Sequence, residues 1–203
     1  MVRVRTRWKN RPGPRSLEEA AGVLAFNLWR IACQGVLDIE NEGFQTDTQR
    51  QRLDIIAEFL AFLVHLTDRM VYGRLDEEAR RRFVTALALR SVDILVDNLK
   101  DVCGPGEYRE EAIARMNERF ADYAGYGYDE KEGPGFGFRR RFGDLVQALV
   151  GPKDRQWVQS YVIDVGAPEV VEHLRKAVRG ILTQIEAAEG GKAPDAAGAP
   201  GAS

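Results

Sequence analysis

The chain has 203 residues, of which 44% are hydrophobic and 30% are charged. This composition is ordinary for a globular protein and too apolar for a disordered one, and the length suits one domain rather than two. The 29 basic and 31 acidic residues give a net charge of −2, which excludes a global electrostatic attraction to nucleic acid or anionic membranes.

The first 15 residues are strongly basic. They carry six positive charges and no acid, and two prolines oppose a regular helix, so we predict a flexible basic arm over 1–15. A solvated terminus is the simpler interpretation. The alternative is nucleic-acid binding, with cations for phosphates and an indole for stacking, through Arg3, Arg5, Arg7, Trp8, Lys9 and Arg11.

Two long helices are expected next. Ser16 is followed three residues later by a glutamate, the spacing of a capping box, and predicts a helix over 17–41. After a glycine, Thr46 or Asp47 can cap a second helix that extends to about Tyr72.

A third helix is predicted from the cap Asp76 to about residue 103, and a fourth over 107–123. Ser91 and Asn98 lie seven residues apart within the apolar arc of the third helix. We interpret them as buried polar groups that fix helix register and are satisfied by backbone or a neighbouring helix. A small polar ligand pocket is the alternative.

The helical pattern stops between residues 125 and 137, where glycines predict a loop of about a dozen residues. Helices are expected again over 139–150 and 152–165, and a last one begins at Pro168. The predicted fold is all-α, a single helical bundle of about six to eight helices over 16–189, followed by a disordered tail over 190–203.

The second helix carries three polar residues, Glu58, His65 and Asp68, within a largely apolar stretch. We favour a polar stripe that faces solvent or a helix seam. The alternative is a helical-bundle enzyme or sensor with a carboxylate-histidine site for a metal or small ligand. That site would also use His173, although the Glu-x-x-His spacing of di-iron bundles is absent.

The cysteines and apolar runs exclude several classes of protein. Cys33 and Cys103 are far apart and form no CxxC motif, and no apolar signal core is visible, so we expect a reducing cytoplasm. A Cys33 nucleophile would need one of only two histidines as its base. The longest charge-free apolar runs, 20–29 and 59–67, are shorter than a membrane span.

The region 123–142 is the expected binding surface. Aromatic residues and arginines, which dominate binding hot spots, border its glycine-rich loop. The candidate partner-binding residues are Tyr123, Tyr126, Tyr128, Phe136, Phe138, Arg139, Arg140 and Arg141. We therefore expect a cytoplasmic, non-enzymatic interaction or assembly module that needs no cofactor and binds a protein partner, with self-association also compatible.

Overall fold

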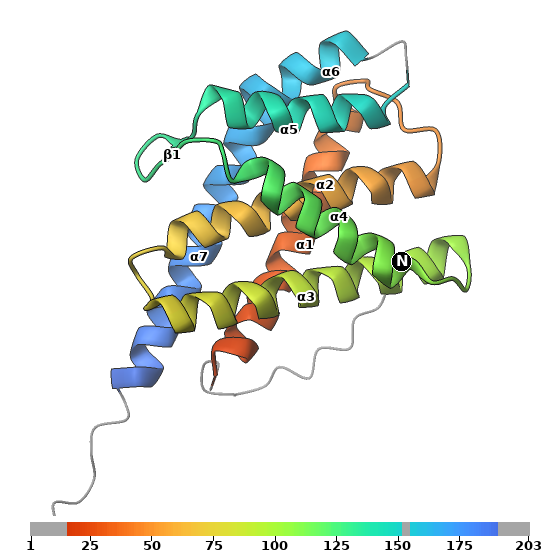
Figure 1. Ribbon diagram of the computed structural model, residues 1–203. Coiled ribbons are helices and arrows are strands. Elements are labelled where there is room, and N and C mark those ends of the chain that lie inside the picture. The colour runs from red at the N-terminus through yellow and green to blue at the C-terminus, as the bar shows by residue number, and fades with distance from the viewer. Residues whose placement is uncertain (1–15, 152–154, 191–203) are drawn as a thin grey trace, which may run out of the picture.

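The computed structural model describes residues 16–151 and 155–190, which form a helical bundle (Figure 1). The all-α prediction is confirmed. In chain order the elements are α1 Leu17–Asn41, α2 Gln49–Val71, α3 Glu77–Cys103, α4 Tyr108–Tyr123, β1 Tyr128–Asp129, β2 Gly133–Pro134, α5 Phe136–Leu149, α6 Arg155–Tyr161, the π-helical segment Val162–Gly166, and α7 Ala167–Gly190. The predicted basic arm and all of the predicted tail beyond residue 190 lie outside the described residues.

Side-chain caps define the starts of the first three helices. The Ser16 hydroxyl accepts the amide three residues on at 3.1 Å, and Asp76 does the same for α3 at 2.9 Å, as the sequence predicts. The prediction of Thr46 or Asp47 as the cap of α2 is wrong. Thr48 is the cap, since its backbone is extended and its hydroxyl accepts the third amide of the turn at 3.1 Å.

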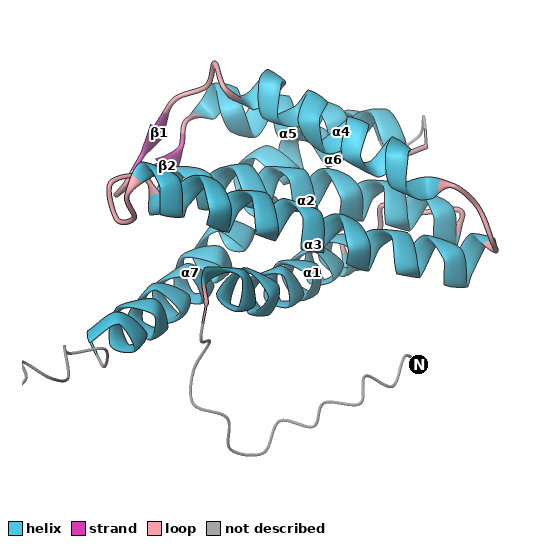
Figure 2. Cartoon of the chain, turned by 60° about the horizontal axis from the view of Figure 1, so that its bottom comes forward, coloured by secondary structure: helices cyan, strands magenta, loops and turns pink. Residues whose placement is uncertain are grey.

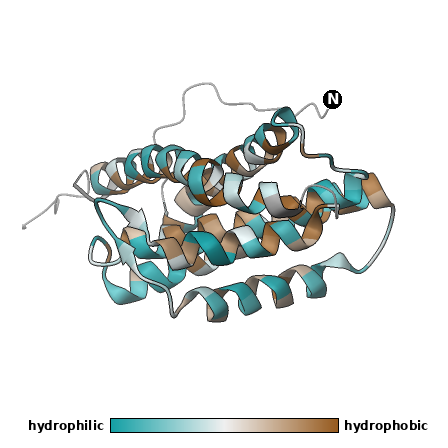
Figure 3. Ribbon diagram, turned by 90° about the horizontal axis from the view of Figure 1, so that it is seen from above, coloured by the Kyte–Doolittle hydropathy of each residue, from teal (hydrophilic) through white to brown (hydrophobic). Residues whose placement is uncertain are grey.

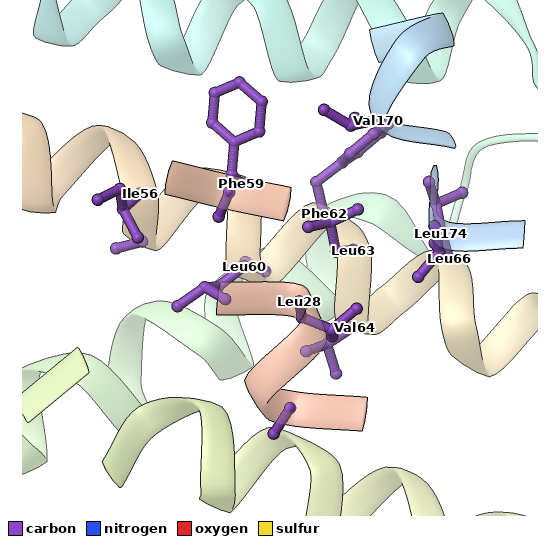
Figure 4. Close-up of a cluster of buried hydrophobic side chains, with 14 of the residues drawn as sticks. Leu28, Ile56, Phe59, Leu60, Phe62, Leu63, Val64, Leu66, Val170 and Leu174 are labelled. Atoms are coloured by element: carbon purple, nitrogen blue, oxygen red, sulfur yellow. The ribbon is translucent and has the colours of Figure 1, made fainter. Parts of the chain in front are cut away.

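Helix α2 is the centre of the bundle. It contacts α1, α3, α4, α5 and α7, and every residue over 55–67 is buried. Figure 4 shows its side chains reaching in opposite directions, with Phe59 directed toward α5 and Val64 toward α3. The Phe62 ring stacks on Phe142 of α5 with 4.2 Å between centroids. Apolar residues accordingly gather on the inner faces of the helices, with hydrophilic residues on the outer faces (Figure 3).

A glycine allows α1 to pack closely against α2. A Cβ atom at Gly35 would lie 2.5 Å from Cε1 of Phe59, well inside normal contact distance. The absence of a side chain at this position therefore sets how near the two backbones come.

The two polar residues inside the apolar arc of α3 are satisfied by their own helix. The Ser91 hydroxyl and the Asn98 amide each donate to the carbonyl four residues earlier, at 2.8 Å. Ser91 is fully buried, and Asn98 is half-buried. The interpretation is confirmed for Ser91, which is buried and satisfied by the backbone. For Asn98 only the hydrogen bond to the backbone is confirmed, because this residue is half-buried.

The predicted loop over 125–137 is wrong in part, because it contains a small β-hairpin (Figure 2). Strands β1 and β2 pair antiparallel, with Tyr128 opposite Pro134. Two paired residues on each strand are too few to show an alternating pattern in the sequence. Helix α5 also begins three residues before its predicted start at 139, since Gly135 already adopts the extended conformation of an N-cap.

The predicted break between the last two helices is replaced by a π-helical segment. Helices α6 and α7 are joined through Val162–Gly166 without a loop. Pro168 lies at the second position of α7 rather than the first. A proline within a continuous helix cannot donate its backbone hydrogen bond and its ring presses on the preceding turn, which accounts for the widened helix just before it.

Helix α1 is long and largely apolar, which bears on the expectation that the chain has no membrane span. It is the one described helix long and apolar enough to cross a membrane by length and composition, and 44% of that window is buried. A core helix passes the same test, and α1 packs against α2, α3 and α7.

Candidate functional site

A cleft lies between the β-hairpin and the first turns of α7. The two strands of the hairpin are at the left of Figure 2. Its volume is about 530 Å³, within the range of binding sites in proteins. We call it the hairpin cleft. Its walls are formed by Gly127, Tyr128, Asp129, Glu132, Gly133, Pro134, Gly135, Phe136, Arg139, Pro168, Val171, Glu172 and Arg175.

The hairpin wall is built by its own turn residues. The Asp129 carboxylate accepts the amides of Lys131 and Glu132, each at 2.8 Å, and closes the turn. These hydrogen bonds lower the pKa of Asp129 and favour its charged form. Gly133 follows with a φ of +89°, a left-handed conformation that favours glycine. The turn therefore depends on two short-range sequence signals.

Arg175 of α7 joins the two walls of the cleft. Its Nη1 donates to Glu172 at 2.7 Å, and its Nη2 donates to the Lys131 carbonyl of the hairpin turn at 2.9 Å. The guanidinium lies so close to Gly133 that a Cβ there would be 3.1 Å from Nη2. Burial raises the pKa of the neighbouring Tyr128 phenol.

Arg139 enters the cleft from the first turn of α5. Its Nη1 donates to the Ile163 carbonyl of the π-helical segment at 2.9 Å. This is its only side-chain hydrogen bond within 16–151 and 155–190, so Nε and Nη2 remain available for a ligand. Phe136, three residues earlier, is 59% exposed at the rim. An apolar ring and an anchored guanidinium thus stand beside one cavity.

The structure brings together some of the predicted partner-binding residues and separates others. Tyr128, Phe136 and Arg139 line the hairpin cleft. Tyr123 and Phe138 are only 0% and 1% exposed, so the prediction that they contact a partner is wrong. Both rings pack in the aromatic core, with centroids 4.8 Å apart.

The three other predicted contact residues lie around the cleft. Tyr126 is half-buried and stacks on Phe138, with 5.9 Å between centroids. Arg141 donates to Asp122 at 2.7 Å, which ties α5 to α4. Arg140 is exposed and does not line the cleft.

The four predicted metal ligands do not gather. Glu58 is held by Arg119, Asp68 is held by Arg80 of α3 at 2.6 Å, and His173 is exposed on α7. Among the residues that the structure describes, no group of three or more histidine, cysteine or acidic side chains could hold a metal ion. The carboxylates that could have met at a metal are instead neutralised by arginines from neighbouring helices.

Glu58 and His65 are nevertheless buried, each 3% exposed, rather than on a solvated stripe. Both lie at the seam of α2 with α4, which agrees with the helix-seam form of the favoured interpretation. Arg119 of α4 donates to both Glu58 oxygens, at 2.7 and 3.1 Å. Burial opposes the charge on Arg119, but these bonds outweigh it and raise the guanidinium pKa.

His65 lies in an aromatic enclosure formed by Phe120 and Tyr123 of α4 and Phe138 of α5, with ring centroids 5.1 to 5.7 Å away. Burial lowers its pKa to about 4, and the charge of Arg69 contributes. The imidazole is therefore neutral at neutral pH. Burial also raises the pKa of the Tyr123 phenol well above its usual value.

The α7 side of the hairpin cleft was not predicted from the sequence. Pro168, Val171 and Arg175 come from a helix about 40 residues further along the chain, and their spacing fits an ordinary amphipathic helix.

The residues of the nucleic-acid hypothesis all lie outside the described part of the chain. The chain matches no protein-family model, and no curated protein or solved structure is significantly similar to it.

Proposed function

We propose that this protein is a non-enzymatic interaction module that binds a segment of a partner protein in the hairpin cleft. The observation that carries the proposal is the pairing of the exposed Phe136 ring with the Arg139 guanidinium at one 530 Å³ cavity. Binding hot spots in protein interfaces are enriched in Trp, Tyr and Arg, and interface cores are also enriched in Phe.

The chemistry of the cleft favours a partner segment with one apolar side chain and one carboxylate. Phe136, Pro134 and Val171 offer apolar contact surface. The two unused donor groups of Arg139 match the planar geometry of a carboxylate, and the bond from Nη1 to the Ile163 carbonyl already holds the guanidinium in place. Pre-ordering of this kind reduces the entropy lost on binding.

Site-specific cross-linking tests the proposal. A photo-reactive phenylalanine analogue replaces Phe136 in the full chain, and a matched control carries it at Leu89 of α3, which is 41% exposed. We expect position 136 alone to cross-link to a defined segment of one partner. Equal products at both positions, or a product formed only with a second copy of the chain, would contradict the proposal.

Affinity measurements with the identified partner then test the residues. We expect R139A to weaken binding roughly tenfold or more because it removes a charge-assisted hydrogen bond. R140A is the matched control, since Arg140 is exposed nearby but does not line the cleft. Equal affinities for R139A and R140A would show that the Arg139 guanidinium does not bind the partner.

A further inference from the structure

Two polar atoms in the core have no hydrogen-bond partner among the described residues. These are Nδ1 of His65 and the phenolic oxygen of Tyr123, both fully shielded from solvent. Most buried polar groups in proteins are hydrogen-bonded, so unpaired ones call for an explanation.

The protonation of His65 follows from its other nitrogen. Arg69 Nε donates to Nε2 of His65 at 3.3 Å, so Nε2 must be unprotonated. The proton of the neutral ring is therefore on Nδ1, the atom without an acceptor. A second proton would have to enter at Nε2 and would abolish the hydrogen bond from Arg69.

The charged groups around His65 would not compensate a positive imidazole. On α2, Glu58 is neutralised by Arg119 of α4. Asp122 of α4 is likewise neutralised, by Arg141 of α5. Arg69 is the charge that acts directly on His65, and it disfavours protonation. Protonation would thus place two cations beside each other at the helix seam.

The same arginine also binds the segment that leads from α4 into the β-hairpin. Arg69 Nη2 donates to the carbonyl of Ala124, the C-cap residue that follows α4, at 3.1 Å. Ala124 precedes β1 by four residues. One guanidinium thereby connects the His65 ring in the core to the segment that leads into a wall of the hairpin cleft.

We propose that the hydrogen-bond chain from His65 through Arg69 to Ala124 is a pH-sensitive latch. It fixes the segment that leads from α4 into the β-hairpin, and protonation of His65 releases that segment. The imidazolium repels Arg69 and removes its acceptor, so the guanidinium leaves the seam and its bond to Ala124 is lost. That release would change the hairpin cleft, a regulatory consequence that rests on the proposed function. The latch itself concerns only this chain and is tested without a partner.

NMR titration of the full chain tests the latch. The imidazole protons of His65 and the backbone amides of 124–138 are followed as the pH is lowered from 7 to well below 4, because the pKa of His65 is about 4. His173, exposed on α7, gives the only other imidazole signal. We expect the hairpin amides to shift with the same midpoint as His65 and to exchange with solvent roughly tenfold faster below it, after correction for intrinsic rates. Amides of α2 should keep their protection.

Two variants separate the latch from general acid unfolding. H65Q has no titratable imidazole, so the pH-dependent shift of the hairpin amides should disappear. In R69Q the latch is absent, so the hairpin should exchange fast at every pH while His65 still titrates. Hairpin amides that do not follow the His65 midpoint in the wild type would overturn the proposal without any variant. Equal loss of protection in α2, or the same hairpin shifts in H65Q, would also overturn it.

Discussion

Arg119 of α4 binds both carboxylate oxygens of Glu58 of α2, at 2.7 and 3.1 Å, in a seam where the two side chains are 12% and 4% exposed. This contact joins α4 to the central helix and leaves Glu58 unavailable to a metal ion.

Breaking this pair from one side should be costly. We expect R119M to lower the free energy of unfolding by about 3 to 5 kcal/mol, because it leaves the Glu58 carboxylate buried without a partner. The double variant E58M/R119M should recover most of the loss, since it removes both charges. Urea denaturation measures both. The exposed pair Arg109–Asp93 is the control, and R109M should cost less than about 1 kcal/mol. A double variant as unstable as R119M would contradict the argument.

Stability should fall in mild acid because of His65. Its pKa is about 4 in the folded protein and 6.5 in an unperturbed chain, so the unfolded chain binds more protons between these values. The free energy of unfolding therefore decreases as the pH is lowered through this window, by up to about 3 kcal/mol. Denaturation at several pH values should show a shallower decrease in H65Q. If the free energy of unfolding had the same pH dependence in H65Q and in the wild type, His65 would not be the cause of the decrease.

Two glycines of α1 should respond to alanine in opposite ways. G35A places a Cβ 2.5 Å from the Phe59 ring and should destabilise the protein by about 1 to 3 kcal/mol through overpacking. G22A meets no atom within 4 Å and should stabilise it by up to about 1 kcal/mol, because alanine favours a helix interior. Thermal unfolding compares the two. Stabilisation by G35A would mean that α1 and α2 are packed less closely than the structure shows.

The Tyr123 hydroxyl should contribute nothing to stability. It is buried without a partner among the described residues, so Y123F should be neutral or stabilise the fold by up to about 1 kcal/mol. Y108F is the matched control, since the Tyr108 hydroxyl donates to the Gly104 carbonyl at 3.1 Å and its loss should cost about 1 kcal/mol. Chemical denaturation distinguishes them. A loss for Y123F as large as that for Y108F would reveal a hydrogen bond to a buried water.

The two cysteines should react at different rates. Burial raises the pKa of Cys33 to about 11, whereas Cys103 is exposed at the end of α3. The thiolate is the nucleophile that attacks a thiol reagent, so we expect one fast and one slow modification at pH 8, and only the slow one in C103S. Denaturant should make both thiols react fast. Two fast phases in the native protein would place Cys33 at the surface.

The starts of α1 and α3 and the ends of α2 and α3 could be predicted from the sequence because their causes are local. The Ser16 and Asp76 caps act over three residues, and Gly73 and Gly104 end their helices with positive φ. The polar groups at 91 and 98 were also placed correctly, since each is satisfied four residues away within its own helix. The small hairpin was missed because its strands pair over only two residues each.

The sequence by itself determined an all-α fold, because hydrophobic periodicity and capping are short-range properties of the chain. Only the tertiary structure decided which side chains meet. Glu58 binds Arg119, which lies 61 residues further along the chain. Arg175 binds the hairpin turn at a residue 44 positions before it. Such pairs depend on how helices pack, and no spacing within one helix encodes them. For the same reason, the sequence showed the aromatic and arginine residues around 123–142, while packing selected Phe136 and Arg139 for the cleft and buried Tyr123 and Phe138.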